Sequence, residues 1–283
     1  MIPAKFDYHA PSTVDEALRL LSEAEDAKVL AGGQSLIPVL RLRLAAPEVI
    51  VDLGRIEELR GVREDGDALA VGAMTPHADM IADPLVREHA ALVAEAAETI
   101  ADPQVRHRGT FGGALVHADP AGDMPTTAVA LGAEFLIAGT RGTRTVAAED
   151  FFEDLFTTAV GEDELLTQVR IPKHTGWGSH YEKFVRVAQQ WSIVAVAAAL
   201  RIDGDSIAEA RVALTNMGST PVRATAVEQR LIGIAPVADA VREAVVDVAE
   251  GTHPPSDLNG DADYRRHLAT VLTGRAVLAA AAG

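Results

Sequence analysis

The amino-acid sequence predicts a two-domain α+β protein. Its 283 residues correspond to roughly two domains, and a hydrophobic fraction of 48% is enough to build substantial cores. The N-terminal part shows strand–helix–strand order, whereas the part after residue 178 shows strands first and helices afterwards, which is typical of an α+β domain. The turn-rich segment 173–178, Lys-His-Thr-Gly-Trp-Gly, lies between these two patterns and is predicted to be a linker.

Elements of the first half are predicted from apolar spacing and from capping and turn residues. Ser12 and Asp15 have the spacing of a capping box ahead of an apolar face, which indicates a first helix. Ser35 can cap a second helix, because it follows a short apolar run that ends in two glycines. The other predicted elements are strands over 28–31 and 49–52 around a helix over 36–44, a hairpin over 61–72, one helix over 84–99, a helix over 124–131, and strands over 133–138 and 165–171.

The second half is predicted to form a three-stranded antiparallel sheet with helices. Three apolar segments indicate strands, and Asp203-Gly204-Asp205 forms a tight turn between the last two. The alanine-rich C-terminal segment favours a helix. The predicted strands are 181–187, 192–202 and 207–216, and the predicted helices are 224–231, 237–250 and 262–282.

Charge and cysteine content exclude several classes of protein. The chain has 25 basic and 41 acidic residues and a formal net charge of −16, which argues against binding to nucleic acid or to anionic membranes. The sequence has no cysteine, so it holds no disulfide and no thiolate-bound iron–sulfur cluster, and it suits the reducing cytoplasm. We expect a cytoplasmic protein without a membrane span, because the N-terminal segment lacks a signal-like apolar run and the apolar run 194–200 is too short.

Two glycine loops far apart in the sequence are the main functional signal. Residues 31–35 read Ala-Gly-Gly-Gln-Ser, and residues 109–114 read Gly-Thr-Phe-Gly-Gly-Ala. Glycine permits positive φ and close approach, so that successive N–H groups can point at phosphate oxygens. Either loop alone is compatible with a simple turn, and neither matches a Walker loop or the GxGxxG fingerprint. Together they favour the binding of a dinucleotide diphosphate.

Three further residues are candidates for ligand contact, each with a structural alternative. Asp123 either caps the helix that follows it or accepts hydrogen bonds from ligand hydroxyls, and the two roles are compatible. Lys183 is either a surface charge or a cation facing the pyrimidine edge of a flavin. Trp191 either belongs to a core or stacks on a planar ring. The turn residues Asp102 and Asp119 and the nearby histidines show no metal-ligand spacing.

These features together resemble the FAD-binding medium subunit of the molybdenum hydroxylases, the family of aerobic carbon monoxide dehydrogenase and xanthine dehydrogenase. The resemblance covers nearly the whole chain, and the two glycine loops are its most specific part. It implies the two-subdomain flavin-binding fold of vanillyl-alcohol oxidase over residues 1–175, divided into about 1–57 and 58–175, followed by a small α+β domain over 176–283. The segments that resemble the family are FDYHAPSTVDEALRLL, LAGGQSLIPVLRLRL, VIVDLGRI, IADPQVRHRGTFGGALVHADPAGDMP, YEKFVRVAQQWSIVAVAAAL and LTNMGSTPVRA.

The resemblance also implies noncovalently bound FAD and a set of binding residues, with no catalytic side chain and no metal ligand. The two loops would line the diphosphate and ribityl chain, Asp123 would bind hydroxyl groups, and Lys183 and Trp191 would lie at the ring. The sequence departs from the family at His107 and Gln190, where Asn and an acidic residue are common. The implied FAD-binding residues are Val29, Leu30, Ala31, Gly32, Gly33, Gln34, Ser35, Leu36, Ile100, Thr110, Phe111, Gly112, Gly113, Ala114, Asp123, Leu166, Lys183 and Trp191.

The same resemblance implies a heteromeric complex. Molybdopterin would be bound by a large partner subunit and [2Fe-2S] clusters by a small one, in a dimer of heterotrimers. FAD on this chain would pass electrons to an external acceptor, and the sequence identifies neither that acceptor nor the substrate. Two other hypotheses are a stand-alone FAD oxidoreductase, which would need a proton donor or acceptor over the flavin, and a binding module without catalysis, in which the glycine loops are only turns.

Overall fold

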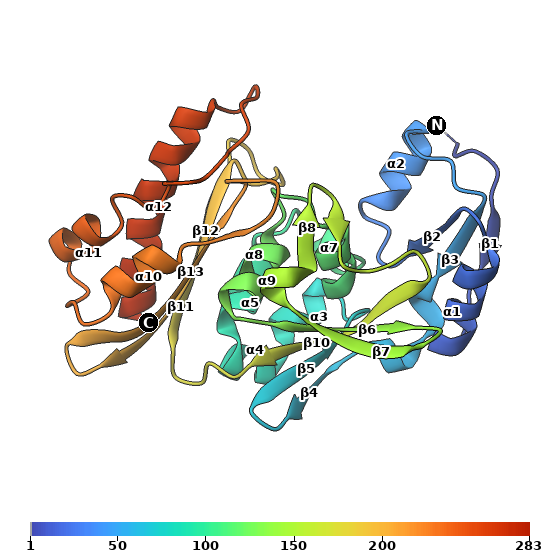
Figure 1. Cartoon of the computed structure of the whole chain (residues 1–283), viewed down its shortest axis with the longest axis horizontal. Helices are drawn as coiled ribbons and strands as arrows, with labels where there is room; N and C mark the ends of the chain where they lie inside the picture. Colours follow the sequence, from blue (N-terminus) through green and yellow to red (C-terminus); the bar gives the residue numbers. More distant parts are fainter. Residues whose placement is uncertain (1) are drawn as a thin grey trace.

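The computed structural model describes residues 2–283. The N-terminal subdomain is a parallel three-stranded sheet in the order β1-β3-β2, next to the helices α1 and α2 (Figure 1). The cap of α1 lies one residue later than predicted, because Thr13 rather than Ser12 accepts the Glu16 N–H. The bounds are β1 Asp7–His9, α1 Val14–Glu23, β2 Ala27–Leu30, α2 Leu36–Leu42 and β3 Val49–Asp52, followed by the 3₁₀ turns Leu53–Arg55 and Glu57–Leu59.

A five-stranded antiparallel sheet in the order β4-β5-β10-β6-β7 forms the centre of the next subdomain. The predicted hairpin over 61–72 is confirmed as β4 and β5. Strand β10 lies in the middle and pairs with both β5 and β6, with a register shift between Leu166 and Gln168. The strands are β4 Val62–Asp65, β5 Ala68–Gly72, β6 Glu134–Gly139, β7 Gly142–Ala147 and β10 Glu164–Pro172, with a separate hairpin of β8 Phe152–Asp154 and β9 Thr157–Thr158.

Two predictions about the helices of this subdomain are wrong. The predicted helix over 84–99 is two helices, because Ala90 adopts φ −147° and ψ 45° and interrupts the hydrogen-bond ladder. The second glycine segment is the start of a helix rather than a loop, since Thr110 caps it by accepting the Gly113 N–H at 3.2 Å. The helices are α3 His77–Ala82, α4 Pro84–His89, α5 Ala91–Glu98, α6 Pro103–Arg106, α7 Phe111–His117, α8 Asp123–Ala130 and α9 Ala148–Phe151.

The C-terminal domain has a four-stranded antiparallel sheet in the order β11-β12-β13-β14, so the prediction of three strands is wrong by one. Strand β14 has only two residues, which is too short for an alternating pattern to reveal. The predicted helix over 237–250 stops at Ala244. The elements are β11 Gly178–Phe184, β12 Val194–Asp203, β13 Ser206–Thr215, β14 Val222–Arg223, α10 Thr225–Leu231, α11 Ala238–Ala244 and α12 Ala262–Ala282.

Strand β12 is buried on both faces and joins the two domains. One face consists of alanines that belong to the core around the five-stranded sheet, and the other carries Val194, Val196 and Leu200 against the C-terminal helices. Figure 1 shows this sheet between α12 on one side and α5 and α8 on the other. No helix within residues 2–283 has the length and apolar character needed to cross a bilayer.

Candidate functional site

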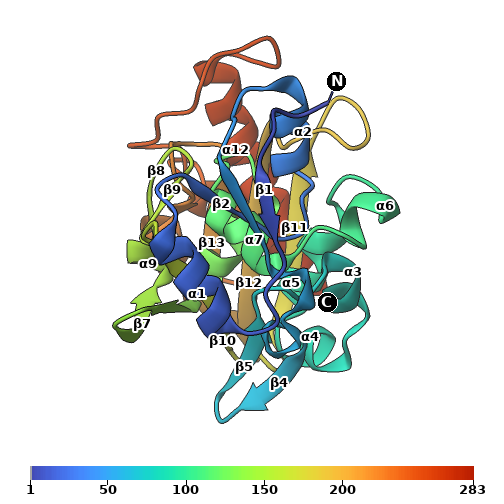
Figure 2. The same ribbon diagram turned by 90° about the vertical axis from the view of Figure 1, so that its right-hand side faces the viewer.

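The fold brings the two glycine loops into direct contact. A Cβ added to Gly32 would lie 2.1 Å from the Arg108 carbonyl oxygen, and one added to Gly113 would lie 3.1 Å from the Ala31 Cβ. The two loops belong to different subdomains. They meet where the end of β2 lies beside the start of α7 (Figure 2). Only glycine at position 32 permits this close approach of the two backbones.

Free backbone donors are concentrated in the first loop. Within the part of the chain that the structure describes, the N–H groups of residues 32–36 make no hydrogen bond, and Gly33 has φ +75°. The N–H of Thr110 is also free, and its hydroxyl keeps a proton to donate because Oγ1 accepts from Gly113. Consecutive free N–H groups around a positive-φ glycine form an anion-binding concavity.

Most of the second loop is held by a neighbouring segment that the sequence did not reveal. The His77 N–H donates to the Gly109 carbonyl at 3.0 Å, and the Gly112 N–H donates to the Ala73 carbonyl at 2.8 Å. A Cβ on Gly112 would lie 2.5 Å from the Ala73 Cβ, and Phe111 is fully buried. The expectation of free N–H groups in both loops is therefore right for the first loop but wrong for most of the second, which is a packing surface.

Asp123 and Lys183, predicted from separate segments, form a buried ion pair. The Lys183 Nζ lies 2.7 Å from Asp123 Oδ2, and the two side chains are 8% and 4% exposed. Lys183 also donates to the Thr99 carbonyl at 3.2 Å. The capping role considered for Asp123 is wrong, since Asp123 is the first residue of α8 and its side chain bonds to Lys183 instead of capping the helix.

Two residues that the sequence analysis missed complete this cluster. The Tyr181 hydroxyl donates to Asp123 Oδ1 at 2.8 Å, and the Ser192 hydroxyl donates to the same oxygen at 2.9 Å. Burial, together with the Asp123 charge, raises the pKa of Tyr181 well above its ordinary value, so the phenol stays protonated and acts as a donor. The spacing of Tyr181 and Lys183 by two residues on one strand was the available signal.

The remaining predicted residues, Ile100, Leu166 and Trp191, lie in different environments. Ile100 is partly buried, and its carbonyl accepts from Arg106 at 2.8 Å, while the neighbouring Ala101 has φ +39°. Leu166 is buried in the core of the sheet. Trp191 is 52% exposed, so the alternative of a core residue is wrong, and its ring lies 6.4 Å from the His117 ring.

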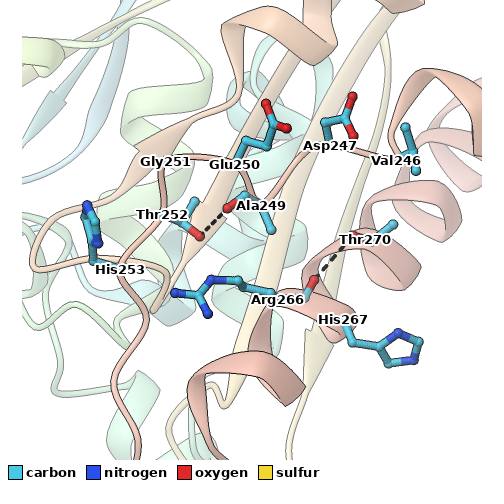
Figure 3. Close-up of a pocket in the computed structure, with 10 residues that line it drawn as sticks. All are labelled: Val246, Asp247, Ala249, Glu250, Gly251, Thr252, His253, Arg266, His267 and Thr270. Carbon is cyan, nitrogen blue, oxygen red and sulfur yellow. Dashed lines mark hydrogen bonds between the residues drawn. The ribbon is translucent and has the colours of Figure 1, made fainter.

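A hollow of about 500 Å³ lies elsewhere, between α12 and the segment 246–253 of the C-terminal domain (Figure 3). Figure 3 shows its charged side chains pointing in different directions rather than at a common point. Asp247 pairs with Arg230 at 2.9 Å, and the Thr252 hydroxyl is bonded to the Ala249 carbonyl. We therefore assign the candidate site to the glycine loops and the Asp123 cluster, where donors and charges converge.

Comparison with known proteins shows similarity over both domains. Residues 4–174 match the model of the FAD binding domain in molybdopterin dehydrogenase, and residues 179–280 match that of the CO dehydrogenase flavoprotein C-terminal domain. The carbon monoxide dehydrogenase medium chain of Hydrogenophaga pseudoflava is 43% identical, over 99% of this chain and 98% of the relative. The glyceraldehyde dehydrogenase medium chain of Sulfolobus acidocaldarius is 38% identical, over 98% of each. A solved structure of the H. pseudoflava carbon monoxide dehydrogenase matches with a TM-score of 0.96 and 44% identity, covering 100% of this chain and 99% of that chain.

Proposed function

Since this chain belongs to the family of FAD-binding medium subunits of the molybdenum hydroxylases, we propose that it is the flavoprotein subunit of such a complex. In this role it takes electrons from iron–sulfur clusters on a partner subunit and delivers them to an external acceptor. FAD supplies the redox chemistry, because its ring can accept and release electrons. The chain's own residues bind and orient the cofactor and shape the electrostatic field around it.

The proposal that this chain binds FAD rests chiefly on the free N–H groups of residues 32–36. They form a donor-rich concavity of the kind that binds phosphate, and the Thr110 N–H and hydroxyl extend it from the second loop. We assign the diphosphate and ribityl contacts to Val29 through Leu36 and to Thr110 through Ala114, with Gly112 and Phe111 acting through packing. Ile100, Leu166 and Trp191 are proposed to border the ring.

The proposal extends to the organisation of the complex. Residues 1–175 would bind FAD, with subdomains of about 1–57 and 58–175, and residues 176–283 would cover the flavin domain. A large molybdopterin-binding subunit and a small iron–sulfur subunit would join this chain in a dimer of heterotrimers in the cytoplasm. The absence of cysteine supports the placement of the iron–sulfur clusters on another subunit, because this chain has no thiolate ligands for them.

A glycine-to-alanine pair tests the first loop in the assembled complex. Gly33→Ala adds a Cβ at a residue with φ +75°, 2.7 Å from the Ile37 Cδ1, and should displace the loop. We expect FAD binding to weaken by about tenfold, since such backbone strain costs about 1–3 kcal/mol. The measurement is the dissociation constant of FAD from the purified complex, followed by flavin fluorescence.

Gly233→Ala is the matched control for this test. Gly233 has φ +86° and no atom within 4 Å of an added Cβ, so the variant introduces similar strain in the C-terminal domain. We expect it to bind FAD like the wild type. Equal FAD affinity in both variants would argue against the loop as the binding site. A folded complex that holds no flavin and cannot be reconstituted with FAD would contradict the proposed function itself.

A further inference from the structure

We propose that Tyr181 and Ser192 are positioning residues that orient the Asp123 carboxylate, so that Asp123 Oδ2 and Lys183 Nζ each present one open hydrogen-bonding position to the cofactor. This inference rests on the proposed function, because it concerns how the same site holds FAD. It assigns to the C-terminal domain a direct part in cofactor binding, since Tyr181, Lys183 and Ser192 all follow the linker.

The hydrogen-bond inventory of the cluster supports the proposal. A carboxylate oxygen has two acceptor positions, and both of those on Asp123 Oδ1 are used, by Tyr181 at 2.8 Å and Ser192 at 2.9 Å. Asp123 Oδ2 accepts from Lys183 at 2.7 Å and keeps one position. The Lys183 ammonium has three N–H groups, of which two go to Asp123 and Thr99. One acceptor and one donor therefore remain side by side.

The position of the Tyr181 hydroxyl is fixed by the fold. Tyr181 and Lys183 are two residues apart on β11, so their side chains emerge on the same face and reach the same carboxylate. The Tyr181 hydroxyl is buried and lies 3.2 Å from Thr215 Oγ1, which in turn lies 2.8 Å from Thr126 Oγ1 on α8. This chain of hydroxyls spans the domain boundary and restricts rotation of the Tyr181 side chain and of the carboxylate.

Loss of the Tyr181 hydroxyl should change the affinity for FAD and its reduction potential, because it changes the orientation and charge of the Asp123 carboxylate. In Tyr181→Phe, Oδ1 loses a hydrogen bond, so the carboxylate can rotate and carries more uncompensated negative charge toward the ring. Reduction adds electron density to the flavin, so a more negative environment should make its reduction less favourable. We therefore expect two effects in the assembled complex. FAD should bind about tenfold more weakly, and the flavin midpoint potential should shift to a more negative value.

The experiment compares Tyr181→Phe and Ser192→Ala with Tyr264→Phe, each purified as the complete complex. Tyr264 lies on α12, partly exposed and edge-on to Phe184, and is the control for loss of a phenol hydroxyl. The dissociation constant of FAD, the flavin midpoint potential and the melting temperature are measured for each. The proposal is supported if Tyr181→Phe and Ser192→Ala change the affinity and the potential while Tyr264→Phe does not.

The inference is overturned if Tyr181→Phe and Ser192→Ala keep the wild-type FAD affinity and potential while Asp123→Ala loses FAD, because Asp123 would then act without its positioning residues. It is also overturned if they lower only the melting temperature, since that marks a purely structural role. Failure of the proposed function gives a different result, in which the wild-type complex itself binds no FAD.

Discussion

At the scale of single residues, the Asp123–Lys183 pair makes a strong prediction about stability. Both side chains are nearly inaccessible, so removal of one leaves the other as an uncompensated buried charge. We expect Lys183→Met to lower the free energy of unfolding by about 3–5 kcal/mol. Chemical denaturation of the purified chain, with the wild type under the same conditions, measures this loss.

A double-mutant cycle separates the pair interaction from general damage. When Asp123→Asn is combined with Lys183→Met, no buried charge remains, and the double variant should be more stable than the sum of the two single losses implies. Arg242→Met is a suitable control, because its ion pair with Asp239 is exposed and should contribute little. Additive losses at Asp123 and Lys183 would contradict a direct interaction.

At the scale of elements, the segment 73–77 supports the second glycine loop and contains a buried histidine. His77 begins α3, and a Cβ on Gly109 would lie 3.0 Å from its Cδ2. Burial, with a smaller effect of Arg106, lowers the pKa of His77 to about 4. The folded chain therefore keeps this imidazole neutral at pH values where the unfolded chain binds a proton.

The free energy of unfolding should decrease as the pH is lowered from 6.5 to about 4. Between pH 6.5 and about 4 the unfolded state binds one more proton at His77 than the folded state, so the free energy of unfolding decreases as the pH falls. We expect a loss of about 3 kcal/mol from this residue. Denaturation curves at several pH values, for the wild type and for His77→Gln, measure this loss. The variant should lack the His77 contribution to the pH dependence of the free energy of unfolding. Parallel pH profiles would rule out His77 as the cause.

Element boundaries could be predicted where a side chain or an apolar pattern marks them. The hairpin at Asp65-Gly66 and the last helix, α12 from Ala262 to Ala282, follow from such signals. The break at Ala90 could not be predicted, because alanine favours the helix and the interruption is a backbone conformation imposed by packing. The start of α7 was hidden for the opposite reason, since its glycines favour a turn although Thr110 supplies a cap.

At the scale of the whole molecule, the site depends on contacts between distant segments. The two glycine segments together suggested a binding site, but the contact of Gly32 with the Arg108 carbonyl is a tertiary one that no local pattern encodes. The same is true of Asp123, for which the sequence predicted a helix cap or a ligand contact but not its pairing with Lys183 and Tyr181. Residue type and spacing identified candidates, and only the fold determined which donors are free.

Successive side chains of β12 point alternately into the cores of the two domains, so the geometry of this site depends on how the domains pack. Ala197 is fully buried in the core that the C-terminal sheet shares with the subdomain of the five-stranded sheet, where a small side chain lets the C-terminal sheet lie close to α5 and α8. Ala197→Leu should push the sheet away, lower the free energy of unfolding by about 1–3 kcal/mol, and weaken FAD binding by separating Tyr181 from Asp123. Denaturation and FAD titration of the complex measure both effects, with Ala238→Leu on the exposed surface of α11 as the control. If Ala197→Leu matched that control in stability and FAD affinity, close contact of the domains would not be what holds the site together.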